Sequence, residues 1–190
     1  MENPLLVLAQ VASILDQQDI NYILVGSLAS SMHGMYRATA DIDILADIKP
    51  KHVQRLVQVL SDDFYLDERA VRDAIHRRSS FNAIHFGSVF KVDFFIPKGD
   101  AFAAIQLQRK QLRSFSSEVD QKIYVASPED TILAKLRWYR EGHEVSTTQW
   151  SDVIGMIGAA NDTLDISYLR QWAEKLGVTD LLERAISEAA

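Results

Sequence analysis

The stretch that decides the fold lies between residues 22 and 45. It begins Tyr22-Ile-Leu-Val25-Gly26-Ser27 and ends Asp41-Ile42-Asp43-Ile44-Leu45. The first four residues are a continuous apolar run ended by Gly-Ser, which predicts a strand buried on both faces. The last five alternate polar with apolar side chains, which predicts a strand with both aspartates on one face. Two strands are therefore expected, one ending at a glycine turn and one carrying paired carboxylates.

Working outward, apolar periodicity predicts the remaining elements of the first two thirds of the chain. Helices are expected at 5–15, 28–33 and 52–60, with a weaker helical stretch at 64–78 and a short helix after residue 100. Strands are expected at 82–86 and 90–96, joined at Gly87-Ser88 in a hairpin, with one or two short strands around 111–115 and 122–125.

The residues Ser127-Pro128-Glu129-Asp130 predict the start of a helix. The serine side chain can cap the first turn, proline occupies the first helical position, and the two acids lie in the first turn. From there the pattern is helical, with helices expected at 128–141, 147–159, 165–176 and 179–188. We therefore predict an α+β fold, with a mixed sheet of about five strands flanked by helices and a C-terminal helical bundle. The expected domains are an α/β core at 1–126 and a helical region at 127–190.

The composition of the chain excludes several classes of functional site. The 190 residues contain 20 Lys and Arg against 26 Asp and Glu, giving a net charge of −6, and no cysteine. Disulfides, thiolate metal sites and cysteine nucleophiles are excluded, so a metal must bind through oxygen or imidazole. The acidic balance argues against a broad nucleic-acid-binding surface. We found no membrane-length apolar run and no basic secretory n-region, and we expect a cytoplasmic protein without membrane attachment.

Three aspartates interrupt strand patterns, at Asp41, Asp43 and Asp93. Burying a carboxylate without a partner is costly, so their recurrence needs an explanation. Residues two apart on a strand lie about 6–7 Å apart on one side. Such a pair, completed by a third carboxylate from a neighbouring strand, suits Mg²⁺, or Mn²⁺ in its place.

The turn at Gly26-Ser27 supplies a complementary feature. Glycine lets the backbone approach a ligand closely, and N–H groups at a helix start bind anions such as nucleotide phosphates. Taken alone, Gly-Ser after a strand is a weak signal.

The combination is more specific. An apolar residue, Gly26, Ser27, thirteen residues, Asp41-Ile-Asp43 and a later strand aspartate resemble the nucleotidyltransferase superfamily with the polymerase-beta-like fold. The resemblance implies a metal-dependent enzyme that transfers a nucleoside monophosphate from an NTP to an acceptor hydroxyl. It implies that Gly26 and Ser27 bind the nucleotide and that Asp41 and Asp43 bind metal. Asp93 would be the third carboxylate, which completes the metal ligands and activates the acceptor.

Residues 25–43 are further similar to small prokaryotic nucleotidyltransferases of abortive-infection and toxin–antitoxin systems. In those, a helix carrying Lys and Arg is followed by an Asp on the next helix, here Lys135, Arg140 and Asp152. Lys135 either contacts the triphosphate or extends along the surface with its charge in solvent. Arg140 and Asp152 are interpreted first as a salt bridge to each other.

Three other residues have two interpretations. Arg37 could clamp a phosphate through two hydrogen bonds, or could be a solvated loop residue. His33 fits packing or capping better than metal binding, because it has no histidine or carboxylate at the i+4 position. His85 could face the aspartates or the opposite side of its strand.

An alternative function is a non-catalytic module of this fold that binds a cognate protein partner in a toxin–antitoxin pair. An unrelated magnesium phosphatase or glycosyltransferase that uses the Asp-Ile-Asp pair fits the Gly-Ser turn less well. For the enzyme, the acceptor could be a protein hydroxyl, a tRNA end or a small molecule, and the NTP is not specified by the sequence.

Overall fold

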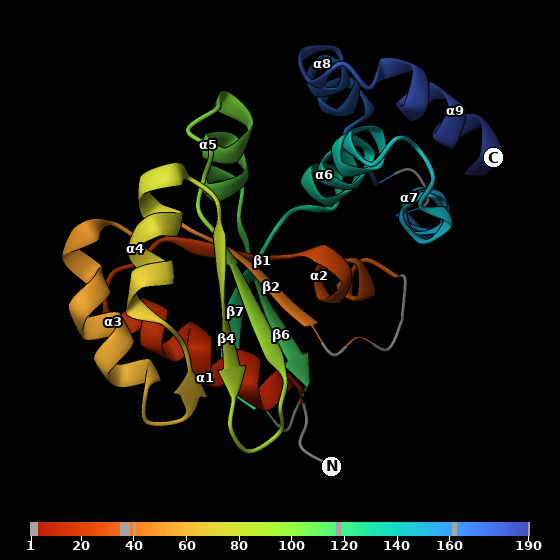
Figure 1. Ribbon diagram of the computed structural model, residues 1–190. Helices are drawn as coiled ribbons and strands as arrows, with labels where there is room; N and C mark the ends of the chain where they lie inside the picture. Colours follow the sequence, from red (N-terminus) through yellow and green to blue (C-terminus); the bar gives the residue numbers. More distant parts are fainter. Residues whose placement is uncertain (1–3, 35–38, 40, 117–118, 161–162, 190) are drawn as a thin grey trace. The chain divides into compact units, whose positions relative to one another are not determined.

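A computed structural model describes residues 4–34, 39, 41–116, 119–160 and 163–189 of the chain (Figure 1). The first part contains helices and strands in mixed order. They are α1 (Pro4–Gln17), β1 (Tyr22–Val25), α2 (Gly26–Met32), β2 (Asp41–Ala46), the short 3₁₀ helix η1 (Pro50–His52), α3 (Val53–Leu60), β3 (Phe64–Tyr65), α4 (Glu68–Arg77), β4 (Ser80–His85), β5 (Lys91–Phe95), α5 (Ala101–Gln108), β6 (Gln111–Ser116) and β7 (Val119–Val125). The rest is helical, with α6 (Pro128–Glu141), α7 (Thr147–Ala160), α8 (Ile166–Leu176) and α9 (Thr179–Ala189).

The strands form one mixed sheet in the order β3-β4-β5-β2-β1-β7-β6. Strands β1 and β2 are antiparallel, β2 and β5 are parallel, and β4 and β5 form the expected antiparallel hairpin. The predicted α+β class is confirmed, but the described sheet has seven strands where about five were expected.

Part of this difference comes from residues 64–65, which the sequence analysis placed in a helical stretch. They form β3, and α4 begins only at Glu68. Phe64 pairs with His85 and Tyr65 with Ile84, so this short segment satisfies its backbone through a partner strand about 20 residues away. The helical pattern holds only from Asp67, whose side chain caps α4 by accepting the N–H of Arg69.

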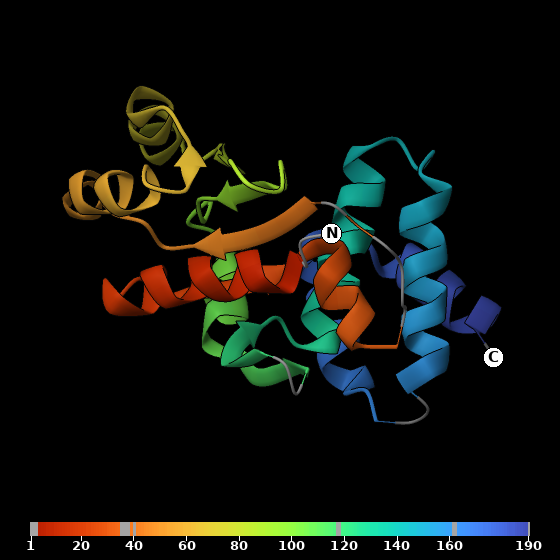
Figure 2. The same cartoon turned by 90° about the horizontal axis from the view of Figure 1, so that it is seen from below.

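The chain divides into two compact units. One comprises residues 1–28 and 38–126, and the other comprises 29–37 and 127–190. In the first, α1 runs along the sheet and packs against β7 and α3, and α3 packs against α4 (Figure 2). In the second, α6 packs against α7 and α8, and α9 against α7 and α8.

Alternation along the strands separates two sides of the sheet. Ile42, Ile44, Val92 and Phe94 project to one side and are completely buried. The intervening residues Asp41, Asp43, Leu45, Lys91, Asp93 and Phe95 project to the other side, which we call the aspartate face. At one end of this face, Leu45 packs with Leu107 of α5 in a buried cluster that Phe95 borders. The carboxylates lie at the other end, where the side chains are partly exposed.

The predicted start of the helical region is confirmed. Ser127 caps α6 by accepting the backbone N–H of Asp130 at 3.1 Å, and Pro128 is the first helical residue. In the described part of the chain, no helix combines the length and the apolar character needed to cross a membrane.

Candidate active site

The strand register brings the predicted site residues of the sheet together. Val25 of β1 lies opposite Asp43 of β2, and Asp43 lies beside Asp93 of β5. Adjacent strands are about 4.8 Å apart, so these positions form a row across the aspartate face. Asp41 is two residues from Asp43 and lies on the same face. The structure therefore gathers Asp41, Asp43 and Asp93 beside the turn at Gly26.

Gly26 is in close contact with Asp43. Its φ of +68° is in the left-handed region, which glycine adopts without steric cost. A Cβ atom at Gly26 would overlap Oδ2 of Asp43 and lie 2.7 Å from its Cγ and 2.9 Å from its Cβ. Glycine is therefore required here for two reasons, the backbone conformation and the space taken by Asp43.

Lys91 is a site residue that the sequence analysis missed. Its Nζ lies 2.7 Å from Oδ2 of Asp93 and 3.7 Å from Oδ1 of Asp41. The hydrogen bond to Asp93 raises the pKa of Lys91, burial opposes this, and the charges of Asp93, Asp41 and Asp43 add to the increase. A signal did exist, since Lys91 precedes Asp93 by two residues and so shares its face. Only the register shows that Lys91 also lies beside Asp41.

Asn82 of β4 is a second addition to the site. It is paired with Asp93 in the antiparallel β4–β5 register, and its side chain is exposed. Its neighbours Phe81 and Ala83 are buried, so Asn82 projects to the aspartate face. The row of site positions therefore continues past Asp93 with an amide that can both donate and accept hydrogen bonds.

The donor chemistry of this face suits a hard cation. Among the described residues, no group of three or more His, Asp or Glu side chains is arranged to hold a metal ion directly. Mg²⁺, however, is usually bound by one or two carboxylates, together with waters and substrate phosphates. Asp41 and Asp43 meet that requirement, and the ammonium group of Lys91 already lies between Asp41 and Asp93 as a cation.

Lys135 makes a buried ion pair in the second unit. Its Nζ lies 2.8 Å from Oδ2 of Asp152 and donates a second hydrogen bond to Oε1 of Gln149 at 3.2 Å. The two charged side chains are only 6% and 7% exposed. The predicted pairing of Arg140 with Asp152 is therefore wrong.

Arg140 instead pairs across to α9. It donates to both carboxylate oxygens of Asp180, at 2.6 and 2.7 Å, and lies 3.2 Å from Glu144. The reason is helical geometry: Arg140 lies five residues after Lys135 on α6, so the two side chains project in different directions. The bond with Asp180 is the main cause of the raised pKa of Arg140 and of the lowered pKa of Asp180.

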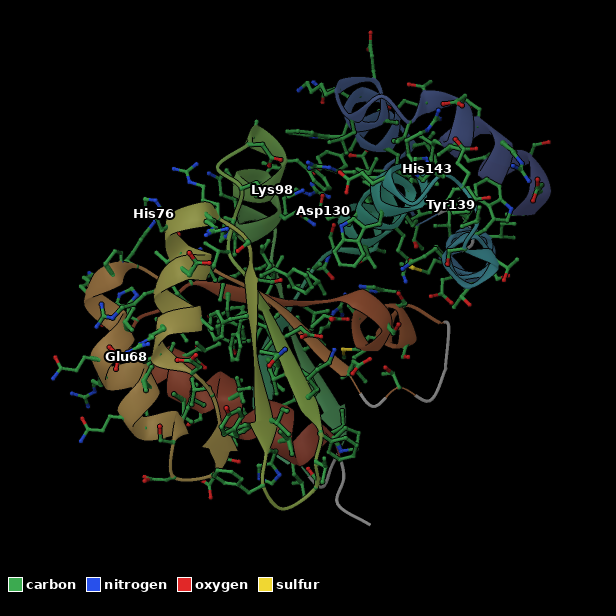
Figure 3. All side chains as sticks on the ribbon, viewed as in Figure 1. Glu68, His76, Lys98, Asp130, Tyr139 and His143 are labelled. Atoms are coloured by element: carbon green, nitrogen blue, oxygen red, sulfur yellow. The ribbon has the colours of Figure 1, made fainter. Side chains whose placement is uncertain are left out.

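The acids at the start of α6 have structural partners. Asp130, at the beginning of this helix in Figure 3, is fully buried and accepts a hydrogen bond from the Tyr168 hydroxyl at 2.6 Å. Glu129 accepts the backbone N–H of Asp165 at 3.2 Å. Both contacts tie α6 to the start of α8, so the helix start expected from sequence also helps to hold the bundle together.

The histidines have different outcomes. His85 is on the side of β4 opposite Asn82, because the two are three residues apart. Its ring packs edge-on against that of Phe64, with the two ring centroids 5.1 Å apart, and its Nδ1 lies 2.8 Å from the Ser88 hydroxyl oxygen. His85 thus does not face Asp93. His33 lies in the turn after α2, and Arg37 lies outside the described residues.

Comparison with solved structures identifies similar folds. An antigenic nucleotidyltransferase-like protein from Paracoccidioides brasiliensis matches with a TM-score of 0.55 and 18% identity, over 96% of this chain and 91% of that one. ANT(2″)-Ia in complex with adenylyl-2″-tobramycin matches with a TM-score of 0.54 and 12% identity, over 94% of this chain and 95% of that one. A solution structure of the antibiotic-resistance factor ANT(2″)-Ia matches with a TM-score of 0.52 and 13% identity, over 96% of this chain and 91% of that one. No protein-family model and no curated protein sequence matches the chain. These likenesses establish the nucleotidyltransferase fold.

Proposed function

We propose that this chain, which has the nucleotidyltransferase fold, is a metal-dependent nucleotidyltransferase that moves a nucleoside monophosphate from an NTP to an acceptor hydroxyl. The observation that carries the proposal is the row formed by Val25, Asp43 and Asp93 on adjacent strands, with Gly26 against Asp43. In this arrangement a glycine turn, a carboxylate pair and a third carboxylate meet at one end of the aspartate face.

In the proposed reaction, the backbone at Gly26 and the hydroxyl of Ser27 bind the phosphates, and Arg37 is a further nucleotide contact. Lys135, which the resemblance also implied as a nucleotide contact, is buried in its ion pair with Asp152 and is given no step here. Asp41 and Asp43 are the principal ligands of Mg²⁺ or Mn²⁺, with Asp93 as the third carboxylate. When bound, the metal ion supplies charge stabilisation to the phosphate oxygens. Asp93 accepts the proton of the acceptor hydroxyl, whose oxygen attacks the α-phosphorus while pyrophosphate leaves.

The acceptor in this proposal approaches from the β4 side of Asp93. Asp43 and the Gly26 turn lie on the other side of Asp93, where the nucleotide is placed, and Asn82 extends the row outward. The acceptor class remains a protein hydroxyl, a tRNA end or a small molecule. The sequence resemblance extends the proposal to a toxin–antitoxin or phage-defence setting in the cytoplasm.

Isothermal calorimetry with ATP, CTP, GTP and UTP, with and without Mg²⁺, tests the proposal. The wild type is compared with Asp41→Ala/Asp43→Ala and with a matched control, Asp47→Ala/Asp62→Ala. Asp47 lies four residues beyond Asp43 and pairs with Lys49, and Asp62 is exposed after α3, so the control removes the same charge while leaving Asp41, Asp43 and Asp93 in place.

The expected result is binding of at least one NTP that needs Mg²⁺, is lost in the site variant and is retained in the control. If a folded wild type binds none of the four, the enzyme proposal fails. The alternative of a non-catalytic module that binds a protein partner would then take its place.

A further inference from the structure

The feature that the proposed reaction does not explain is Lys91, an ammonium group placed among the carboxylates. It lies on β5 beside Asp41 of β2 and two residues before Asp93, and it contacts both at 3.7 and 2.7 Å. No catalytic step above requires a cation of the protein at this place. Its position therefore calls for a separate account.

The arrangement has an electrostatic cause. Three carboxylates on neighbouring positions of one sheet face repel one another, and a positive charge placed among them offsets this repulsion. The positive charge of Lys91 interacts with Asp41, Asp43 and Asp93 together. Of its two ion-pair partners, Asp93 is the closer and the more buried, with a side chain that is 20% exposed. In the protein without metal, Lys91 thus balances part of the negative charge of the site.

A divalent ion on Asp41 and Asp43 would place two more positive charges within a few ångströms of this ammonium group. Like charges at that distance disfavour simultaneous occupancy, and both cations draw on Asp41. Lys91 is able to leave, because its side chain is flexible and 41% exposed. The direct consequence is competition between the two cations.

We propose that Lys91 is an internal cation that holds Asp41 and Asp93 in the metal-free protein and must leave them when a divalent metal ion binds. The inference rests on the proposed function, because it takes Asp41 and Asp43 as the metal ligands. Lys91 is a positioning residue in this account: it keeps Asp93 in place before metal and nucleotide arrive, and it lowers the affinity of the empty site for metal.

Binding of Mn²⁺ alone, followed by electron paramagnetic resonance and calorimetry, tests this without any assay of activity. Lys91→Met removes the charge and keeps most of the stem, whereas Lys91→Arg keeps the charge. Lys98→Met is the matched control, because Lys98 is exposed in the loop after β5 and its loss changes the net charge equally (Figure 3). Circular dichroism shows that each variant is folded, and Lys91→Gln replaces Lys91→Met if the latter is not.

We expect Lys91→Met to bind Mn²⁺ at least about tenfold more tightly than the wild type, because a close positive charge has been removed. Lys98→Met and Lys91→Arg should stay within about twofold of the wild type, since both keep a cation beside the carboxylates. Adding Asp43→Asn should abolish binding in either background. Without metal, Lys91→Met should melt at a lower temperature than Lys98→Met, and Mn²⁺ should reverse the difference.

Equal Mn²⁺ affinity in Lys91→Met and the wild type overturns the inference and leaves the proposed metal site intact. Weaker binding in Lys91→Met also overturns it, since Lys91 would then assist the metal. If neither protein binds Mn²⁺ at millimolar concentration, both the inference and the proposed metal dependence fail. Binding only in Lys91→Met is the strongest support.

Discussion

Replacing Gly26 with alanine separates two demands that the structure makes at this position. One is the left-handed backbone, with φ of +68°, and the other is the space taken by the Asp43 side chain. Gly177, which ends α8, has the same φ of +68°, and a Cβ added there would meet no atom within 4 Å. Gly177→Ala is therefore a control that carries the backbone cost without the collision.

The backbone cost for alanine in the left-handed region is about 1–2 kcal/mol, and it should be the same in both variants. In Gly26→Ala, the new Cβ would also be 2.9 Å from the Cβ of Asp43. Rotating the carboxylate relieves the overlap with Oδ2 but not this second contact, so β1 and β2 must move apart locally. Because Val25 and Asp43 are paired in the sheet, the shift displaces Asp43 from its row with Asp93.

Two assays distinguish the effects. Urea unfolding followed by circular dichroism should show a loss of about 1–2 kcal/mol in Gly177→Ala and a larger loss in Gly26→Ala. Calorimetry should show Mg²⁺-dependent NTP affinity unchanged in Gly177→Ala but weakened at least about tenfold in Gly26→Ala. If the two variants are equally stable and bind NTP equally well, the close approach of Gly26 to Asp43 has no functional role and the reasoning is refuted.

Two further predictions concern the second unit, where all three tryptophans lie, so their fluorescence reports its unfolding. Lys135→Met should lower the free energy of unfolding by about 3–5 kcal/mol, because it leaves Asp152 buried without its ammonium partner, and Lys135→Met/Asp152→Leu should recover most of the loss. A small loss in the single variant, together with loss of NTP binding, would instead favour the nucleotide contact. Stability should also fall in acid. Hydrogen bonds from arginines lower the pKa of three exposed carboxyls, those of Asp180, Glu183 and Glu188. The stability that these carboxyls add is therefore fully present above their ordinary pKa and is lost as the pH falls through the lowered values. Urea midpoints measured from pH 7 to pH 3, at low and high salt, check this, and a midpoint that is independent of pH would contradict it.

Local patterns were sufficient to predict most elements. The alternation at residues 41–45 placed Asp41 and Asp43 on one face, and the Ser-Pro-Glu-Asp run placed the start of α6. Both signals act between residues close together in the chain, where side-chain periodicity and capping are decided. β3 shows where this approach fails, because two residues carry too little pattern to compete with a neighbouring helical signal.

Pairings between distant residues could not be predicted in this way. Arg140 was predicted to pair with Asp152, but the directions of the side chains on α6 pair Lys135 with Asp152 and Arg140 with Asp180 of α9. The same holds for His85, whose two alternatives were resolved only by the β4–β5 register, which pairs Asn82 with Asp93 and so turns His85 to the opposite side of the sheet.

The sequence by itself determined which side chains share a strand face, because the period of two is a property of the backbone. It therefore determined that Asp41 and Asp43 lie on the same face of one strand, but it did not determine how far Asp93 lies from them. Only the tertiary structure decided that β5 lies beside β2 with Asp93 next to Asp43 and Lys91 next to Asp41. The physical reason is that register is chosen by hydrogen bonding and burial between segments 50 residues apart, where a shift of one residue would have turned Asp93 and Lys91 to the opposite face.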